Sequence, residues 1–325
     1  MTILRDMTQR FRFSVPLIGM LFFQTALSAP ITTIVDGGYS YNKHLQCTAY
    51  LHAPEPSKVK HNHYATLHFF QSGTGIYTTY FDKSWINQNN YYLTIDKPGI
   101  TPAGSDPDHP NVDREFYDYY TTDTLINCAQ NALYWANHYL SHTKKSIILS
   151  GHSEGSIVMT NLVHRIFSDK KATQLQLDMK ALFLSGVVMD KMSDIITYQF
   201  KEMPQAAYLS AYQAYDTHNS DYFYHNFHTN WCWMDNALNR KYPLSERLFD
   251  LAKTDAGKAL PIEIFQGLFD KKVPATSIIN FEKENAEKPQ EQQLHLTVRY
   301  YAADHKLSDP TLSDMRLLLN KYFLE

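Results

Sequence analysis

The chain has 325 residues, 44% of them hydrophobic and 19% charged, and its formal net charge at pH 7 is −3. This balance is typical of a folded globular protein with one large core or two smaller ones, and it excludes an extended disordered chain. Without an excess of Lys and Arg the protein lacks the basic surface that nucleic-acid binding usually requires. We therefore expect no nucleic-acid partner.

Residues 1–28 have the order of an export signal, with a basic start, an apolar run and a small-residue end. Because Pro30 disfavours cleavage directly after Ala29, we expect cleavage between Ser28 and Ala29. The mature protein would then be soluble and either periplasmic or secreted. The alternative is an uncleaved anchor, for which the apolar run is short. If the segment is uncleaved, we expect contact with a membrane through it alone.

After residue 64, short apolar runs alternate with helical patterns, which predicts an α/β fold around a mostly parallel sheet. The expected strands are residues 65–70, 91–96, 146–150, 181–186, 261–267 and 294–301. Residues 122–140 and the run after Glu154 carry apolar residues at helical spacing. A last helix is expected to begin with Asp309 as its cap and Pro310 at its first position.

Residues 190–257 contain no predicted strand and are rich in aromatic residues, His and Met. Because so long a connection between neighbouring strands is unusual, we interpret residues 190–257 as an inserted, largely helical cap. Residues 29–189 and 258–325 then form the core. The aromatic residues of the cap either line a substrate pocket or form the cap's own core; they are Tyr222, Phe223, Tyr224, Trp231 and Trp233.

The three cysteines, Cys47, Cys128 and Cys232, allow one disulfide and leave one thiol over. The sequence does not choose the pair, and three free buried thiols are an equal alternative. His225, His228 and Cys232 have a spacing that zinc can use. Because a fourth ligand is not evident, we expect no metal.

Residues 145–160 read KSIILSGHSEGSIVMT, and Ser153 lies between Gly151 and Gly155 where a strand is expected to turn into a helix. At so sharp a turn the serine is strained, and side chains at the two glycine positions would collide with neighbouring chain. The hydroxyl then stands at the carboxyl end of the strand, beside the positive end of the helix dipole. This pattern predicts a nucleophile elbow.

A serine hydroxyl needs a base, and the base needs an orienting carboxylate. Asp270 in FQGLFDKKVP and His305 in AADHKLSD each follow a later strand, in the order Ser, Asp, His. Asp190, which follows the strand at 181–186, is the rival carboxylate. His152 is expected to pack behind the elbow and His295 to lie within a strand, so neither is expected to be the base.

With these residues the sequence resembles the α/β-hydrolase fold family of serine hydrolases, from about Cys47 to the end. The motifs that carry the resemblance are FFQSGTG, TIDKPG, GHSEG, GLFDKKVP and ADH. The resemblance implies that Ser153 is the nucleophile, His305 the general base and acid, and Asp270 the carboxylate that orients the imidazole. It implies no cofactor.

The resemblance also implies an oxyanion hole made of two main-chain N–H groups. One belongs to Glu154, directly after the serine. The other comes from the loop after the strand at 65–70, which the family often writes His-Gly-x-Gly and which reads QSGTG here. Gly73 is our choice for the second donor, and Thr74 is the alternative.

We therefore expect an exported serine hydrolase that cleaves a small-molecule ester, or an amide or short peptide, through an acyl-enzyme. A peptidase on the same fold is the nearer alternative, because GHSEG also occurs in peptidase-like members. A binding protein that retained the fold without catalysis is the alternative of another class. The presence of all three side chains, Ser153, Asp270 and His305, argues against it.

Overall fold

The structure is a computed structural model that describes residues 29–54, 64–78, 90–103, 106–140, 144–168, 177–201, 203–240, 243–307 and 311–324. The predicted export signal lies outside these residues. So do Asp309 and Pro310, the predicted start of the last helix.

The core is an eight-stranded sheet with the strand order β1-β2-β4-β3-β7-β8-β9-β10. The strands are β1 (Ile31–Ser40), β2 (Lys43–His52), β3 (Tyr64–Gln71), β4 (Tyr91–Asp96), β7 (Lys144–His152), β8 (Leu177–Ser185), β9 (Ile262–Gly267) and β10 (Leu296–Tyr301). From β4 to β10 all neighbours pair in parallel. The six predicted strands form this parallel part, so the predicted fold class is confirmed.

Two strands at one edge of the sheet, β1 and β2, were not predicted. They form an antiparallel hairpin whose turn residues, Tyr41 and Asn42, have φ angles of 46° and 67°. Two positive φ angles are typical of the two-residue turn that fits the twist of a hairpin. A smaller antiparallel pair, β5 (Ile100–Ala103) and β6 (Asp106–Val112), follows β4 and was also not predicted.

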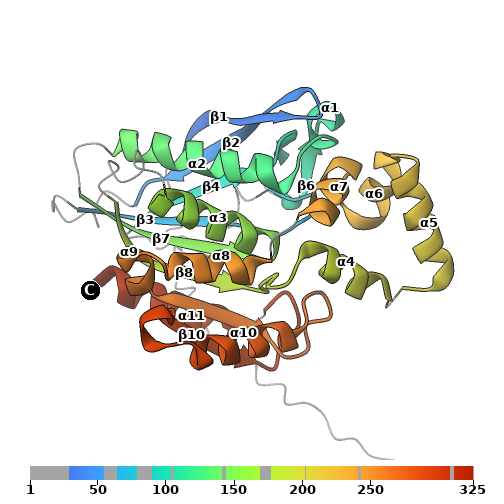
Figure 1. The fold of residues 1–325 in the computed structure, drawn as a ribbon. Helices are drawn as coiled ribbons and strands as arrows, with labels where there is room; N and C mark the ends of the chain where they lie inside the picture. The colour runs from blue at the N-terminus through green and yellow to red at the C-terminus, as the bar shows by residue number, and fades with distance from the viewer. Residues whose placement is uncertain are drawn as a thin grey trace, which may run out of the picture.

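Helices cover both faces of the sheet (Figure 1). The larger core cluster joins one face to α2 (Thr122–Tyr139), α3 (Glu154–Ser168), α8 (Leu244–Leu251) and α10 (Ala275–Glu287). The smaller cluster joins the other face to α11 (Thr311–Leu324). The structure also has two short helices, α1 (Arg114–Tyr117) and α9 (Asp255–Ala259). No helix within the described residues is both long and apolar enough to cross a bilayer.

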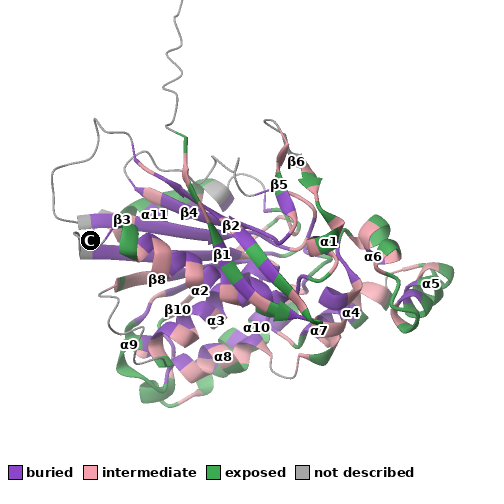
Figure 2. Cartoon of the chain, turned by 90° about the horizontal axis from the view of Figure 1, so that it is seen from above, coloured by how far each residue is buried: buried purple, intermediate pink, exposed green. Residues whose placement is uncertain are grey.

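The distribution of buried residues follows from these layers (Figure 2). Every residue of β9 is buried, as expected for a strand covered on both faces. Alternate residues of β8 and β9 divide between the two clusters: Leu182 and Ile264 face the larger one, and Phe183 and Phe265 the smaller one. Thr121 caps helix α2, because its side chain accepts from the N–H of Thr124.

The described part of residues 190–257 consists of helices joined by turns and short loops, and it contains no strand. Helices α4 (Met192–Lys201), α5 (Gln205–Asp216), α6 (Ser220–Phe227) and α7 (Trp231–Asn239) gather beyond one end of the sheet (Figure 1). Helix α8, from the same stretch, instead packs against α3 beside the sheet. The assignment of residues 190–257 to a separate cap stays a prediction.

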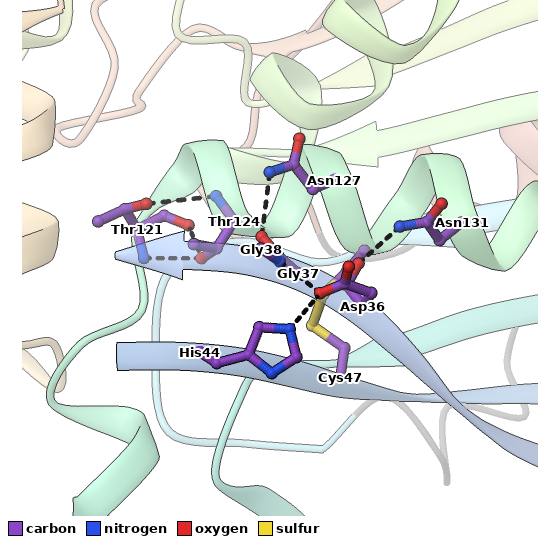
Figure 3. Close-up of a disulfide and its surroundings, with 10 residues drawn as sticks. Asp36, Gly37, Gly38, His44, Cys47, Thr121, Thr124, Asn127 and Asn131 are labelled. Atoms are coloured by element: carbon purple, nitrogen blue, oxygen red, sulfur yellow. Dashed lines mark hydrogen bonds and ion pairs between the residues drawn. A yellow bond between two sulfur atoms is a disulfide. The ribbon is translucent and has the colours of Figure 1, made fainter. Parts of the chain in front are cut away.

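A disulfide joins Cys47 on β2 to Cys128 on α2, with 6.0 Å between their Cα atoms. This decides the pairing that the sequence left open, and Cys232 is a buried free thiol. The bridge connects the edge hairpin to the helix that covers it (Figure 3).

Two amide side chains of α2 hold the same hairpin (Figure 3). The Nδ2 of Asn127 donates to the carbonyl of Gly37 at 3.0 Å, and the Nδ2 of Asn131 donates to the carbonyl of Asp36 at 2.7 Å. Both carbonyls belong to the stretch of β1 where its register with β2 shifts. The amides thus satisfy backbone acceptors at an irregular point of the sheet edge.

Candidate active site

Ser153 occupies the turn between β7 and α3 with a φ of 54°, in the left-handed region that non-glycine residues rarely adopt. Its N–H donates to the carbonyl of Ser185 on β8 at 2.9 Å, and its carbonyl accepts from the N–H of Ser156 at 2.9 Å. The side chain of Ser156 donates to the same carbonyl at 2.6 Å. These bonds hold the strained residue between strand and helix.

The two glycines around Ser153 lie where a side chain would collide with main chain. A Cβ atom at Gly151 would be 2.2 Å from the carbonyl oxygen of Gly155, and one at Gly155 would be 2.0 Å from the carbonyl oxygen of Gln71. Both distances are far below van der Waals contact. The elbow can therefore pack against the end of β3 only with glycine at both positions.

Asp270 and His305 meet at the same edge of the sheet, after β9 and β10. The Nδ1 of His305 lies 2.8 Å from the Oδ2 of Asp270. The other carboxylate oxygen, Oδ1, accepts from the N–H groups of Lys272 at 2.8 Å and Val273 at 2.9 Å. The carboxylate is thus fixed by its own loop and presents one oxygen to the imidazole.

The same contacts set the charge of Asp270. Burial by itself raises the pKa of this carboxyl, but the hydrogen bond and charge of His305 and the N–H groups of Val273 and Lys272 outweigh burial. The pKa of Asp270 therefore lies below its usual value, and the group is a carboxylate at neutral pH. A carboxylate at Nδ1 favours the imidazole tautomer that leaves Nε2 without a proton.

Ser153 and His305 line one cavity of about 260 Å³, together with Thr74. Apolar side chains form much of the rest of its wall; they include Met192, Ile196, Phe200, Phe227, Trp233 and Met234. Most of these come from α4 and α7, so the helices beyond the end of the sheet close this cavity. It is a concave site in which these apolar side chains alternate with polar ones, including Gln199, Asn226 and Lys272.

The predicted aromatic residues of this region divide between cavity and core. Trp233 lines the cavity. Phe223 is fully buried in the larger core cluster, and Tyr222, Tyr224 and Trp231 pack against that cluster. The aromatic content thus serves mainly the packing of α5 to α7.

The two residues predicted to supply oxyanion donors both lie beside Ser153. A Cβ atom at Gly73 would be 2.8 Å from the Cβ of Ser153, so the loop after β3 approaches the serine closely. Thr74, the alternative donor, lines the cavity. Glu154 is the first residue of α3, where a main-chain N–H has no acceptor within the helix.

The side chain of Glu154 has contacts that the sequence did not indicate. Its carboxylate is buried, and Oε1 accepts from the hydroxyl of Thr122 at 2.9 Å and from the Nε1 of Trp233 at 2.6 Å. The one sign of these contacts in the sequence is that Glu154 is a charged residue within an apolar stretch. Lys97, which contacts the loop after β3, was likewise not singled out.

His152 packs behind the elbow, as predicted, and contacts His305 with 4.9 Å between ring centroids. Its Nδ1 lies 3.0 Å from the hydroxyl of Ser185. Burial, reinforced by the charge of His305, lowers the pKa of His152 to about 3. The ring is therefore neutral at physiological pH.

The rival residues lie elsewhere. Asp190 accepts a hydrogen bond from the hydroxyl of Ser277 and does not line the cavity that contains His305. His295 is exposed and directly precedes β10 rather than lying within it.

The three residues weighed as zinc ligands do not form a site. His225 lies on α6, His228 caps its end with a φ of 52°, and Cys232 is buried on α7. Among the residues that the structure describes, no group of three or more His, Cys, Asp or Glu side chains could hold a metal ion.

No family model matches the chain, and no curated protein matches its sequence. Among solved structures it is similar to the esterase Pf2001 of Pyrococcus furiosus, with a TM-score of 0.53, 10% identity and 91% of each chain covered. Lpx1, the peroxisomal α/β-hydrolase of Saccharomyces cerevisiae, gives a TM-score of 0.51 at 11% identity over 90% of this chain and 88% of that chain. A puromycin-hydrolysing peptidase of Mycobacterium tuberculosis gives 0.51 at 13% identity over 91% of this chain and 40% of that chain.

At these identities the likeness concerns the fold. It agrees with a mostly parallel eight-stranded sheet, helices on both faces, and a strand–serine–helix turn at the carboxyl edge. The chain has the α/β-hydrolase fold.

Proposed function

We propose that this protein is a serine hydrolase that cleaves carboxylic esters through an acyl-enzyme. The observation that carries the proposal is the 2.8 Å contact between His305 Nδ1 and Asp270 Oδ2, with His305 and Ser153 lining one cavity. A strained serine, a buried carboxylate and a histidine, in that chain order, fit this chemistry on this fold.

In the proposed reaction, the Nε2 of His305 takes the proton of the Ser153 hydroxyl while Oγ bonds to the ester carbonyl carbon. The carbonyl π electrons move to its oxygen. When the tetrahedral intermediate collapses, the bond to the alcohol oxygen breaks and His305 gives its proton to the leaving alcohol. Water then repeats the sequence on the acyl-enzyme, releasing the acid and restoring the serine. Asp270 stabilises the imidazolium in both halves.

The substrate class follows from the wall of the cavity. Its apolar side chains favour an ester with an apolar acyl or alcohol group, because burial of such a group contributes about 25 cal/mol per Å². At about 260 Å³ the cavity suits a small molecule rather than a folded polymer. We therefore propose a small ester with an apolar part as substrate.

Two measurements test the proposal: labelling by a fluorophosphonate probe, and turnover of p-nitrophenyl esters compared with aminoacyl p-nitroanilides. Wild-type protein is expected to be labelled and to prefer the esters, and Ser153→Ala to lose both properties. Ser168→Ala, at the exposed end of the same helix, is the matched control and should keep both. An unlabelled, inactive wild type would favour the binding-protein alternative, and faster amide turnover would favour a peptidase.

We also propose that the protein is exported. The basic and apolar order of residues 1–28 supports this, as does a disulfide between Cys47 and Cys128, since disulfides persist in oxidising compartments. Expression of the full chain in a Gram-negative host, with fractionation and mass measurement, tests it. A periplasmic product beginning at Ala29 is expected, whereas a full-length membrane-bound product would support the anchor.

A further inference from the structure

Lys97 is a buried cation beside the proposed catalytic serine, and no step above uses it. It follows β4 in the sequence IDKPG, and its side chain is almost completely covered. Its Nζ donates to the carbonyl of Gly73 at 2.7 Å and to the carbonyl of Gly75 at 2.9 Å. Both carbonyls belong to the loop after β3, which lies against Ser153. A buried charge that binds main chain in this way fixes that main chain.

Tyr77 supports the same point of the loop. Its hydroxyl donates to the carbonyl of Gly73 at 2.6 Å, and its ring lies 4.8 Å from the Nζ of Lys97. One carbonyl oxygen thus receives two donors, which use both of its lone pairs. The ring of Tyr120 lies 5.8 Å from the same ammonium and adds a second cation–π contact.

The direction of one carbonyl determines the direction of the next N–H. In a trans peptide the C=O of one residue and the N–H of the following residue point to opposite sides. Here the carbonyl of Gly73 points to Lys97, which does not line the cavity, whereas Thr74 does line it. Holding this carbonyl therefore turns the N–H of Thr74 away from Lys97, and Thr74 lines the same cavity as Ser153.

The charged and titratable groups facing Lys97 come from several elements. They are Asp96 on β4, Glu154 on α3, and the rings of Tyr77 and Tyr120. Burial lowers the pKa of Lys97 to about 8, although Glu154 and Asp96 act to raise it. The ammonium is accordingly the main form at neutral pH.

We propose that Lys97 is the positioning residue that orients the loop after β3 so that the N–H of Thr74, rather than that of Gly73, stabilises the oxyanion. This rests on the proposed hydrolase function. Lys97 acts through the loop and does not touch the substrate. The N–H of Glu154 remains the other donor.

The test measures kcat and KM for a p-nitrophenyl ester with Lys97→Met, which keeps the apolar stem and removes the donors. We expect kcat to fall about 10- to 100-fold with little change in KM, somewhat less than the roughly 10²–10³-fold that loss of one oxyanion donor costs. Inhibition by phenylboronic acid, which forms a tetrahedral anion, should weaken in parallel. Lys283→Met, exposed on α10, is the matched control and should change neither.

The pH profile separates positioning from a merely structural role. In wild type, kcat should fall as pH rises above about 8, because a neutral amine makes weaker hydrogen bonds to the two carbonyls. Lys97→Met should lack this fall. Deprotonation of a lysine whose pKa is lowered in the folded state stabilises that state, so loss of folding through Lys97 cannot cause the decline.

If Lys97→Met does not fold, Tyr77→Phe decides, because it removes one hydrogen bond to Gly73 and keeps the ring. It should lower kcat about 3- to 10-fold, as expected for loss of one hydrogen bond. A folded Lys97→Met with kcat within 3-fold of wild type, or a Tyr77→Phe with unchanged kcat when Lys97→Met is unfolded, would overturn the inference. If wild-type protein is labelled and active, such a result overturns the role of Lys97 and leaves the proposed hydrolase function standing. An inactive wild type would overturn both the hydrolase function and the role of Lys97.

Discussion

His305 and Asp270 lie in contact, with 2.8 Å between Nδ1 and Oδ2, although they follow different strands. Strands β9 and β10 are parallel neighbours, and Gly267 at the end of one pairs with Tyr301 at the end of the other. A Cβ atom at Gly267 would be 2.4 Å from the carbonyl oxygen of Ala303. The close approach of the two chain segments thus brings the loops of the histidine and the aspartate together.

Asp270→Asn is expected to lower kcat for a p-nitrophenyl ester by roughly 10³–10⁴-fold. An amide at this position leaves the imidazole in the wrong tautomer and does not stabilise the imidazolium. Asp190→Asn is the matched control, because Asp190 contacts Ser277 away from the cavity. Steady-state kinetics on both folded variants check this. A larger loss in Asp190→Asn would assign the carboxylate to the rival residue.

Gly155→Ala is expected to reduce the free energy of unfolding by about 1–3 kcal/mol, since overpacking shifts the surrounding main chain. The added Cβ would lie 2.0 Å from the carbonyl oxygen of Gln71. Ser168→Ala in the same helix should change stability by less than about 0.5 kcal/mol. Urea unfolding monitored by circular dichroism measures both. Equal stability of Gly155→Ala and wild type would contradict the close packing of the elbow on β3.

Replacing both Cys47 and Cys128 by serine is expected to lower the free energy of unfolding by about 2–5 kcal/mol. The bridge closes a sequence separation of 81 residues, which restricts the unfolded chain strongly. Wild type treated with reductant should approach the stability of the double variant. Alkylation of the denatured, unreduced protein, read by peptide mass mapping, should modify Cys232 alone. A modified Cys47 or Cys128 would show a different pairing.

His152 makes the protein sensitive to acid. Its pKa is lowered to about 3 by burial and by His305, whereas an unfolded histidine titrates near 6.5. Between pH 3 and pH 6.5 the unfolded state binds one proton more than the folded state. The free energy of unfolding therefore keeps its full value above about pH 6.5 and falls as the pH decreases. At pH 5 the loss is about 2 kcal/mol relative to pH 8.

His152→Asn has no titrating ring and should lose correspondingly less stability between pH 8 and pH 5. Thermal or urea unfolding of the variant and of wild type at both pH values gives this difference. His295→Asn, which alters an exposed histidine, should behave like wild type. If all three proteins lost the same stability, the acid sensitivity would have to come from another group.

The parallel strands could be predicted because short apolar runs such as residues 146–150 and 181–186 are typical of strands buried on both faces. The hairpin β1–β2 was missed because its turn, at Tyr41 and Asn42, lacks the Asn-Gly or Asp-Gly pair that usually marks it. The disulfide partner of Cys47 depends on the contact between β2 and α2, which no spacing reveals.

For the candidate site, Ser153, Asp270 and His305 could be predicted because each must follow a strand at the same edge of the sheet. Lys97 and the carboxylate of Glu154 could not, because their partners come from distant loops and helices. Single charged residues near apolar runs occur throughout the sequence, and only the fold shows which of them are enclosed. Their assignment to the proposed site therefore needed the spatial arrangement.

The bond between Trp233 Nε1 and Glu154 Oε1 limits how the candidate active site could be exposed to solvent. Swinging α7 outward would break this bond to a buried carboxylate, at about 1.5–3 kcal/mol, and would leave Thr122 as the donor to Oε1. A hinge motion of the whole of α7 in each catalytic cycle is therefore disfavoured. A substrate that reaches Ser153 with α7 in place leaves the bond between Trp233 and Glu154 intact.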